Sequence, residues 1–528
     1  MRRSARSAEP RLWWRDPGLL GALGVGLALH LALLAARISP QSGEEAVWGL
    51  MARAIQRGAE FPVLLWRAHF CGTLYLYLAQ PLWALTGLSL ATVRLAHMPW
   101  VLVQIMLTYW LALQWHSVTA ARVAALVVAC GSVFFAAHAV FPAFTVALTL
   151  GWATLALCWW ASAAEARASR RWWWCGIIGG LAVWAGPMAA ASILTMLSFV
   201  GWAERARWRR HLTSVIAGLL VGAVPLLLYN VAHPGATFLR LIGGRTLRMN
   251  RADWAQTPTL EYMAQHVQAA LGDLLPMAAT AWQSLREFLS LNRVPYVWYT
   301  VAGSVITLGV AWCVLRWLGQ RASSRDPRAR WLLCALLLWT VIIYLINRNP
   351  HGRYWLPSYL LIAIAVGAWW AATWQRGGVH RVTALCALAT LLLWNLGSLG
   401  LLVQRRPLDY QRIGQYLLAH NVRTGYSTFQ IAYPVILTTD EHVILSPTAI
   451  TDISDRQPRY TELVRHAPQA AYVLPAQSPA TAAMEERLRA LGLRWERADV
   501  GGAVIYTELR RHVTPAELAL PDAPEDEL

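Results

Sequence analysis

Two adjacent carboxylates, Glu44 and Glu45, follow the first long apolar stretch of the chain, where packing gives no reason for them. A carboxylate at the level where lipid headgroups meet water can accept a proton from an incoming hydroxyl or amine. Residues 46–57 are predicted to form a short helix, and acids at a helix start also interact favourably with the helix dipole. The spacing therefore leaves two interpretations of the pair, a general base and a helix cap.

Arginines and histidines recur in the segments that we predict to lie on the same side of the membrane as these acids. Arginine presents a fork of donors that matches phosphate oxygens, so we expect at least one of the group to bind an anion. For any single member, solvation or snorkelling toward headgroups is the better explanation. The group comprises Arg53, Arg57, Arg67 and His69, then Arg240, Arg245, Arg248 and Arg251, and finally Arg348, His351 and Arg353.

The composition of the 528-residue chain is that of a membrane protein, with 57% apolar residues, 30 tryptophans and a positive mean hydropathy. Its formal charge of +18 comes from arginines placed mostly in short links between apolar runs, which is the positive-inside pattern. Because no groove-reading motif accompanies this charge, nucleic acid is excluded as a partner. A Gly-rich phosphate loop and zinc-ligand spacing are also missing, so we predict no cofactor, and a need for divalent metal is left open.

Runs of about 20 apolar residues predict about eleven transmembrane helices and a multi-pass membrane protein. Charge alternation places the N-terminus in the cytoplasm and puts segments 38–92 and 231–295 outside, together with everything after residue 403. Helix-like stretches at 259–275 and 278–291 are expected at the membrane surface. The predicted spans are 17–37, 93–115, 119–137, 142–161, two arms within 172–203, 212–230, 296–318, 331–346, 354–374 and 380–402.

The stretch 172–203 has basic residues beyond both ends and Gly186-Pro187 at its middle, which predicts a turn. Each arm would have about 16 residues, or roughly 24 Å, against a hydrocarbon core of about 30 Å. Irregular backbone at that depth is tolerated only where it is buried in protein or lines a watery cavity. We therefore expect this hairpin to help wall a cavity that opens to the outside.

Residues 404–512 differ in composition from the membrane region and are predicted to form a small extracytoplasmic α/β domain. Helix-like stretches occur at 410–419 and 480–491, and β-like runs occur at 443–445, 471–474 and 503–507. The last residues, 513–528, are predicted to be a disordered tail with an acidic end. The membrane domain is thus predicted to cover residues 1–403.

Several segments resemble the GT-C glycosyltransferases of the protein mannosyltransferase and aminoarabinose transferase type, a family 39-like group, and above all their bacterial relatives. The likeness covers nearly all of the membrane region and extends to the C-terminal domain. The matching pieces are SGEEAVWGLMARAIQRG at 42–58, HFCGTLYLYLAQPLWALTG at 69–87 followed by Arg94, GLAVWAGPMA at 180–189, GAVPLLLYNVAHPGATF at 222–238 and GRYWLPSYL at 352–360.

This resemblance implies a mainly α GT-C fold and sugar transfer from a polyprenyl-phosphate-linked donor to a lipid, glycan or protein acceptor outside the membrane. Glu44 stands where the family usually has Asp and Glu45 where it has Glu, so these acids would be catalytic. Arg353 and Tyr354 match an Arg-Tyr pair that begins a late helix. The residues implied to bind substrate are His69, Arg94, Arg348, His351, Arg353 and Tyr354.

Two departures from the family pattern keep other functions open. The first acid is Glu instead of Asp, which moves its carboxyl by one methylene, and residues 66–71 replace a Tyr- and Gly-rich segment. One alternative is therefore a catalytically inactive relative that serves as a binding or assembly subunit. The other is a transporter or flippase of a lipid-linked saccharide, which the near absence of acids in the spans and of internal repeats disfavours.

Overall fold

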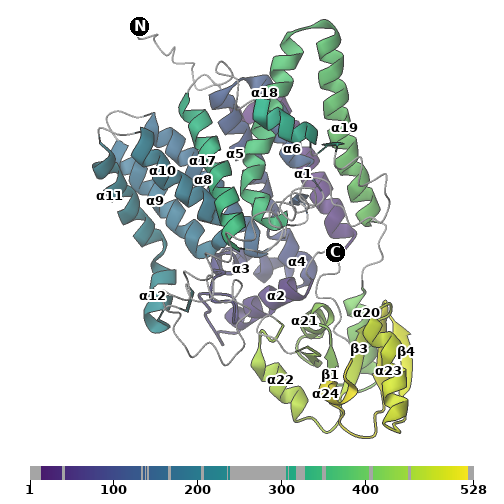
Figure 1. The fold of residues 1–528 in the computed structure, drawn as a ribbon. Helices are drawn as coiled ribbons and strands as arrows, with labels where there is room; N and C mark the ends of the chain where they lie inside the picture. The colour runs from purple at the N-terminus through teal and green to yellow at the C-terminus, as the bar shows by residue number, and fades with distance from the viewer. Residues whose placement is uncertain are drawn as a thin grey trace, which may run out of the picture. The chain divides into compact units, whose positions relative to one another are not determined.

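The computed structural model shows a helical chain that folds into two compact units (Figure 1). One unit contains Met1–Ala32 and Met98–Leu401, and the other contains Leu33–His97 and Leu402–Leu528. The second unit thus joins the first predicted outside loop with the C-terminal domain. The residues described are 13–37, 42–132, 135–136, 138, 142–163, 168–203, 207–234, 236–237, 305–306, 308–316, 327–347, 352–403, 408–449 and 454–520.

The first unit is a bundle of apolar helices. Within the described residues, six helices are long and apolar enough to cross a membrane, or seven if one bent pair counts as a single span. Helix α6 has only 12 residues and most of 296–318 lies outside the described residues, so the number eleven stays a prediction. The helices are α1 (Pro17–Ala35), α5 (Met98–Trp115), α6 (Val118–Ala129), α8 (Pro142–Ser162), α9 (Ala168–Ala185), α10 (Ala190–Ala203), α11 (Trp208–Gly222), α12 (Val224–Ala232), α17 (Pro327–Asn347), α18 (Tyr359–Gln375) and α19 (Gly378–Val403). Short 3-10 segments are η1 (Trp13–Arg15), η2 (Pro187–Ala189) and η4 (Gly352–Ser358).

The turn predicted at Gly186-Pro187 is confirmed. Helix α9 ends at Ala185, η2 forms the turn, and α10 runs back beside α9 (Figure 1). The Cys175 Sγ and Met196 Sδ atoms, which lie at similar distances from the turn along the two arms, are 3.5 Å apart. Glycines also allow α9 to approach α11 closely, because a Cβ at Gly180 would meet the Leu219 carbonyl oxygen.

The span predicted as continuous at 212–230 is bent. Helices α11 and α12 meet at an angle of 63° across a one-residue break. Pro225 lies in the first turn of α12, where it lacks an N–H and would clash with a carbonyl of the preceding turn. The apolar composition predicted the span correctly but did not predict this bend. The predicted surface helices at 259–275 and 278–291 lie outside the described residues.

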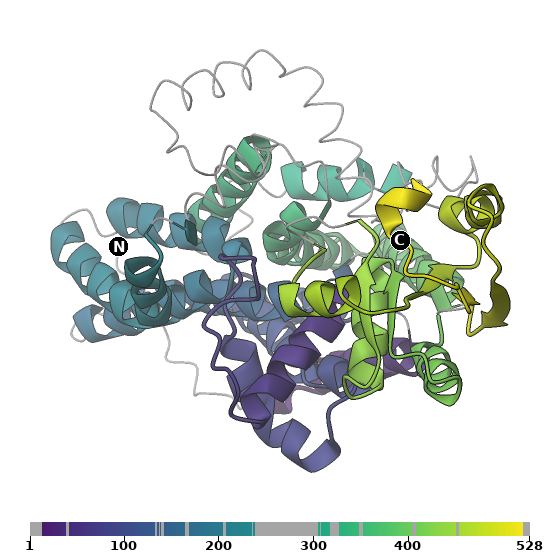
Figure 2. The same ribbon diagram turned by 90° about the horizontal axis from the view of Figure 1, so that it is seen from below.

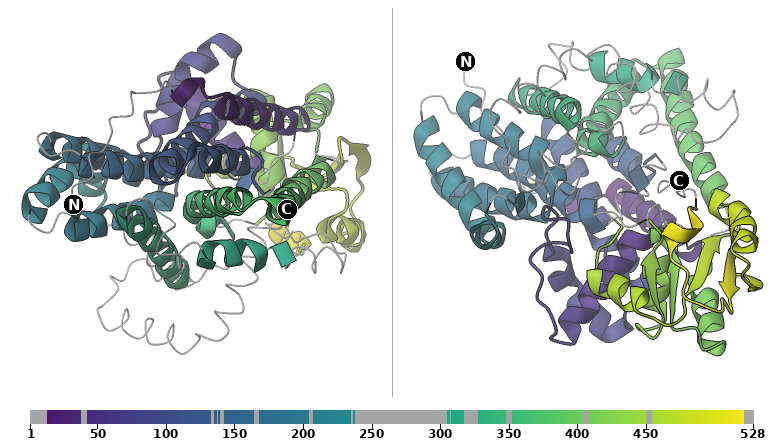
Figure 3. Two further views of the ribbon diagram at one scale, coloured as in Figure 1. Left: turned by 90° about the horizontal axis from the view of Figure 1, so that it is seen from above. Right: turned by 60° about the horizontal axis from the view of Figure 1, so that its bottom comes forward.

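The C-terminal part of the second unit is the predicted α/β domain, drawn in green to yellow in Figure 3. It is built on a five-stranded sheet of order β2-β1-β3-β5-β4. Strands β2, β1 and β3 pair in parallel, and β3, β5 and β4 pair antiparallel. Its elements are α20 (Tyr410–Ala419), β1 (Thr424–Ser427), α21 (Phe429–Thr438), β2 (Ile444–Pro447), α22 (Pro458–Arg465), β3 (Ala471–Pro475), α23 (Pro479–Ala490), β4 (Glu496–Val500), β5 (Ala503–Thr507) and α24 (Pro515–Leu518).

The core of this domain extends beyond its predicted end at residue 512. Val513 and Leu518 are fully buried in the same apolar cluster as Tyr472 and Met484. The Tyr472 hydroxyl donates a hydrogen bond to the Val513 carbonyl oxygen at 2.9 Å. Residues 513–520, predicted as part of a tail, therefore belong to the domain, because α24 supplies an apolar residue to its core.

Three helices of the second unit come from the predicted first loop: α2 (Ser42–Gln56), α3 (Leu74–Thr86) and α4 (Leu90–Leu95). Figure 2 shows these purple helices beside the yellow-green helices of the C-terminal domain, where α2 packs against α21. The segment 38–92 was predicted as an outside loop of the membrane domain. In the structure it shares a compact unit with the C-terminal domain.

Candidate active site

Glu45 lies in the first turn of α2 and is held in a buried ion pair. Its side chain is 1% exposed, and the Arg94 Nε atom lies 2.7 Å from its Oε2. Arg94 is itself buried on α4, whose start is fixed by a capping box between Ser89 and Thr92. A carboxylate in such a pair is already committed to its partner. We infer that Glu45 and Arg94 hold the start of α2 against α4.

Tyr410 at the start of α20 reaches the same group from the C-terminal domain. It shares a side-chain hydrogen bond with Ser42, the first residue of α2, and it feels the charges of Arg94 and Glu45. Burial raises the pKa of Tyr410, against the opposing effects of the Ser42 hydrogen bond and of Arg94. The phenol is therefore neutral near pH 7.

Glu44 differs from its neighbour in partner and in exposure. Its side chain is 12% exposed and forms an ion pair with Arg456, which lies just before α22 and is 7% exposed. The second carboxylate oxygen, Glu44 Oε2, is buried and has no hydrogen-bond partner among the described residues. Glu44 therefore keeps one acceptor atom that can receive a proton or a hydrogen bond.

Three of the first-loop arginines that the sequence grouped as phosphate-binding candidates instead pair with carboxylates. The Arg53 Nε and Arg57 Nη2 atoms lie 3.2 and 3.1 Å from Asp440 Oδ1. The Arg67 Nη1 atom lies 2.8 Å from Asp455 Oδ2. Their common function is to join the first loop to the C-terminal domain, which the charge pattern of the loop alone did not predict.

The contact between α2 and α21 requires a glycine at position 43. Gln430 Oε1 accepts a hydrogen bond from the Gly43 N–H at 2.9 Å, which caps the start of α2. A Cβ at Gly43 would lie 2.7 Å from the Phe429 carbonyl oxygen and 2.7 Å from its ring. A backbone atom cannot turn away as a side chain can, so this position tolerates no larger residue without movement of α21.

We expect Gly43→Ala to destabilise the second unit by about 1–3 kcal/mol, the usual cost of overpacking. The unfolding midpoint in detergent measures the effect. Gly49→Ala is the matched control on the same helix, because the nearest atoms that its Cβ would meet are side-chain atoms of Leu437 and Val93 and not backbone atoms. Equal midpoints for Gly43→Ala and the unchanged protein would show that α21 does not lie this close to α2.

His69 lies in a tight loop between α2 and α3. Leu64 and Gly72 form an isolated antiparallel bridge across this loop, and Leu65 N–H donates to the Cys71 carbonyl oxygen at 2.7 Å. His69 has a φ of 58°, in the left-handed region that non-glycine residues rarely adopt. Such strain persists only where the surroundings impose it, and it concentrates at functional sites. A substrate-binding role for His69 stays a proposal.

Arg353 and Tyr354 lie in η4 of the first unit. The Arg353 guanidinium carbon is 5.9 Å from the centre of the Phe144 ring and 5.7 Å from that of Tyr354, distances at which a cation interacts with a ring face. Tyr354 is buried. Arg348 and His351, the other two residues predicted in this link, lie outside the described residues.

The predicted site residues thus fall into two groups. The structure brings Glu45 and Arg94 into direct contact, with Glu44 next to them in sequence and His69 in the same unit. The sequence did not predict Arg456 or Tyr410, which lie more than 350 residues beyond the acids they reach. Among the described residues, no three His, Cys, Asp or Glu side chains lie close enough together to hold a metal ion.

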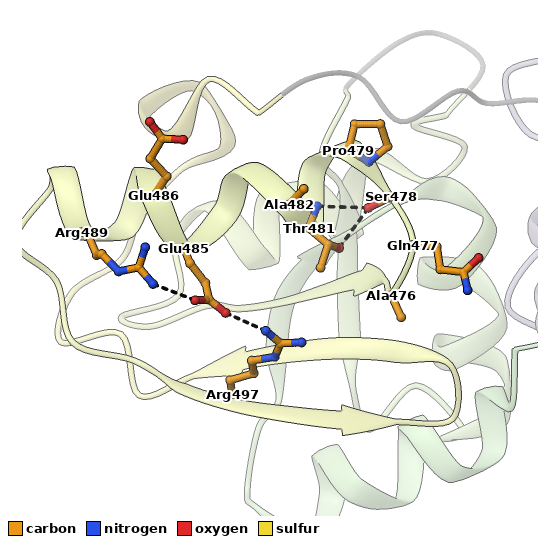
Figure 4. A pocket seen from close by; sticks show the side chains of 10 residues that line it. All are labelled: Ala476, Gln477, Ser478, Pro479, Thr481, Ala482, Glu485, Glu486, Arg489 and Arg497. Carbon is orange, nitrogen blue, oxygen red and sulfur yellow. Dashed lines mark hydrogen bonds and ion pairs between the residues drawn. The ribbon is translucent and has the colours of Figure 1, made fainter.

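An open depression of about 900 Å³ on the C-terminal domain contains none of these residues (Figure 4). Its wall carries Glu485, whose carboxylate pairs with Arg489 at 3.0 Å and with Arg497 at 2.8 Å. Ser478 and Thr481 in the same wall are bonded to each other at the start of α23. Its polar side chains are thus largely paired among themselves, and we do not assign it as the site.

No protein-family model and no curated protein matches this chain, but solved structures do. ArnT from Cupriavidus metallidurans bound to undecaprenyl phosphate aligns with 92% of this chain and 97% of its own, at 16% identity and a TM-score of 0.60. The apo state of the same protein aligns with 92% of this chain and 98% of its own, at 15% identity and a TM-score of 0.56. The Archaeoglobus fulgidus oligosaccharyltransferase in complex with Zn and sulfate aligns with 93% of this chain and 73% of its own, at 13% identity and a TM-score of 0.53.

Proposed function

The chain has the GT-C fold, and on that premise we propose that it is a membrane glycosyltransferase. The donor is a sugar linked to a polyprenyl phosphate, and the acceptor is a lipid, glycan or protein outside the cytoplasmic membrane. The observation that carries the proposal is that the two adjacent acids have different partners. Glu45 is buried in an ion pair with Arg94, whereas Glu44 keeps an acceptor oxygen without a partner among the described residues.

The reaction needs a base at the acceptor and little else from side-chain chemistry. The acceptor oxygen attacks the anomeric carbon of the sugar and forms the new C–O bond. The bond from that carbon to the phosphate oxygen breaks, and the polyprenyl phosphate leaves with the electron pair. The acceptor proton passes to Glu44 Oε2, because that atom is an available carboxylate acceptor at the start of α2.

Glu45 and Arg94 position this base. Because Arg94 fixes Glu45 at 2.7 Å, the first turn of α2 has a defined place relative to α4. A base must lie within hydrogen-bond reach of the proton it takes, and a displacement of 1 Å is costly. The longer Glu side chain at position 44 suits a setting in which Arg456 holds one of its oxygens.

The donor phosphate is bound by basic residues in this proposal, and the candidates are His69 and Arg94 of the second unit and, as a separate group, Arg348, His351 and Arg353, with Tyr354, of the first unit. Arginine suits this task because its fork of donors matches phosphate oxygens. ArnT, which shares this fold, was solved with undecaprenyl phosphate bound. The polyprenyl-phosphate sugar is a substrate in this proposal, and no resident cofactor takes part. Besides the donor and the acceptor, the protein contacts the lipid of the membrane.

The proposed localisation is the bacterial inner membrane, with the N-terminus in the cytoplasm and the C-terminal domain outside. A phosphatase reporter that works only outside the cytoplasm, fused after Gln404, should therefore be active. A fluorescent reporter that matures only in the cytoplasm, fused at the same place, should be dark. The reverse pattern would place the acids on the wrong side for a donor presented outside and would overturn this topology.

The experiment that tests the function follows a labelled sugar. Membranes that contain the protein are supplied with a panel of undecaprenyl-phosphate sugars, hexoses and pentoses, each carrying ¹⁴C in the sugar. We expect the label to leave the lipid-phosphate fraction for a lipid, glycan or protein fraction, which membranes without the protein do not show. Label that crosses the bilayer but stays on lipid phosphate would indicate a transporter. No movement with any donor would indicate an inactive relative.

A further inference from the structure

The C-terminal domain supplies a side chain to each acid of α2, since Tyr410 lies near Glu45 and Arg456 pairs with Glu44. We propose that Arg456 is part of the transfer site, where it positions Glu44 and binds the acceptor hydroxyl together with it. This inference rests on the proposed function and adds a residue to it. The domain is then a component of the active site, beyond any role in attachment.

The ion pair between Glu44 and Arg456 leaves one hydrogen-bond acceptor and one hydrogen-bond donor without a partner among the described residues. Glu44 Oε2 and Arg456 Nε are both buried, and neither has a hydrogen-bond partner among the described residues. One is a pure acceptor and the other a pure donor. An alcohol group has one of each: its oxygen accepts from Nε–H, and its proton is donated to Oε2. Leaving such atoms empty costs about 1–3 kcal/mol each, so the pair favours a ligand of this kind.

The backbone at Arg456 is held firmly enough to position a side chain. The Tyr433 hydroxyl oxygen accepts hydrogen bonds from the Arg456 N–H at 2.7 Å and from the Gln457 N–H at 3.1 Å. The neighbouring Asp455 accepts from Arg67 and from the Thr461 hydroxyl, both at 2.8 Å. Arg456 is therefore anchored on both sides, on α21 and on the first loop.

Attachment of the domain alone does not explain this pair. Arg53, Arg57 and Arg67 already join the first loop to the domain through Asp440, Glu441 and Asp455. These pairs involve acids with no proposed chemical role. The pair at Arg456 instead takes one oxygen of the proposed base and leaves the other for the substrate. In the transfer step the second oxygen, Glu44 Oε2, receives the proton of the acceptor hydroxyl while the C–O bond between the donor sugar and its phosphate breaks.

The test uses the full-length protein in membranes, with the ¹⁴C-labelled undecaprenyl-phosphate sugar that the unchanged protein accepts. Arg456→Gln should lower kcat about 10- to 100-fold and leave the KM for the donor within about twofold, because only the acceptor side is changed. Arg456→Lys keeps a charged donor and should recover most of the loss. Asp440→Asn is the matched control: it removes the ion pairs that Arg53 and Arg57 of the first loop make with the domain, and its kcat should stay near that of the unchanged protein.

Each outcome separates this inference from its premise. Normal kcat in Arg456→Gln, with Glu44→Gln inactive, would overturn the role of Arg456 and leave the proposed function in place. Equal losses in Arg456→Gln and Asp440→Asn would show that attachment alone matters and would also overturn it. Full activity in Glu44→Gln would remove the proposed base and the role of Arg456 with it. If Arg456→Gln does not fold, Arg456→Lys provides the test, because lysine keeps a charged hydrogen-bond donor at this position. A fall in kcat for Arg456→Lys as large as that for Glu44→Gln would then also count against the inference.

Discussion

Glu44→Gln is expected to lower the rate of sugar transfer about 10³-fold and to leave the binding of undecaprenyl phosphate unchanged. An amide cannot take up the acceptor proton, and the loss of a general base usually costs about 10²–10⁴-fold in rate. The substitution keeps the shape of the side chain and one oxygen for Arg456. Transfer is measured with the ¹⁴C donor at saturation, and binding is measured with labelled undecaprenyl phosphate.

Two companion variants define this result. Glu44→Asp keeps a carboxylate one methylene shorter, so we expect partial activity. Glu60→Gln changes an exposed acid of the same loop, whose partner among the described residues is the ring N–H of Trp66, and should have no effect. If Glu44→Gln kept more than a tenth of the normal rate, Glu44 would not be the base.

Arg94→Gln is expected to destabilise the protein by about 3–5 kcal/mol, which is the cost of leaving one member of a buried ion pair without its partner. Glu45 is 1% exposed and lies 2.7 Å from Arg94, so water cannot replace the lost charge. The unfolding midpoint in detergent measures the change. The double variant Glu45→Gln/Arg94→Gln removes both charges and should recover most of the stability.

The control for this effect is an exposed ion pair of the same unit. Arg57 is 50% exposed and pairs with Glu441, so Arg57→Gln should cost less than about 1 kcal/mol. Similar midpoints for Arg94→Gln and Arg57→Gln would contradict the burial of the Glu45–Arg94 pair. A double variant no more stable than Arg94→Gln would show that packing around Arg94, and not charge, carries the effect.

Much of the fold was predictable because long apolar runs and helix breakers act locally. The runs gave α1, α8, α17 and α19 within a few residues, and Gly186-Pro187 gave the hairpin. The helix α20 was predicted at its observed bounds. Strand β4 was missed because it is a largely exposed strand at the end of the sheet, without the apolar alternation of a buried strand.

The candidate site was predictable only where its residues are close in sequence. The acids were found because Glu44 and Glu45 are adjacent and follow an apolar run. Arg456 and Tyr410 were missed because contacts between segments hundreds of residues apart leave no local pattern. Charge offered one usable signal: the first loop is rich in arginine, and Asp440, Glu441 and Asp455 of the C-terminal domain are its counterparts.

The most direct test of the proposed function is the stoichiometry of the reaction in a single turnover. Protein in detergent is mixed with an equimolar ¹⁴C-labelled undecaprenyl-phosphate sugar and with membrane extract as acceptor source. Transferred label and free undecaprenyl phosphate are then counted together. We predict that the two appear in a 1:1 ratio with the unchanged protein, and that neither is detected with Glu44→Gln within the time of one turnover of the unchanged protein, because its rate is about 10³-fold lower. If Glu44→Gln formed as much of both products as the unchanged protein does, Glu44 would not be the base. If the unchanged protein released no undecaprenyl phosphate from any donor in the panel, the proposed function would be wrong.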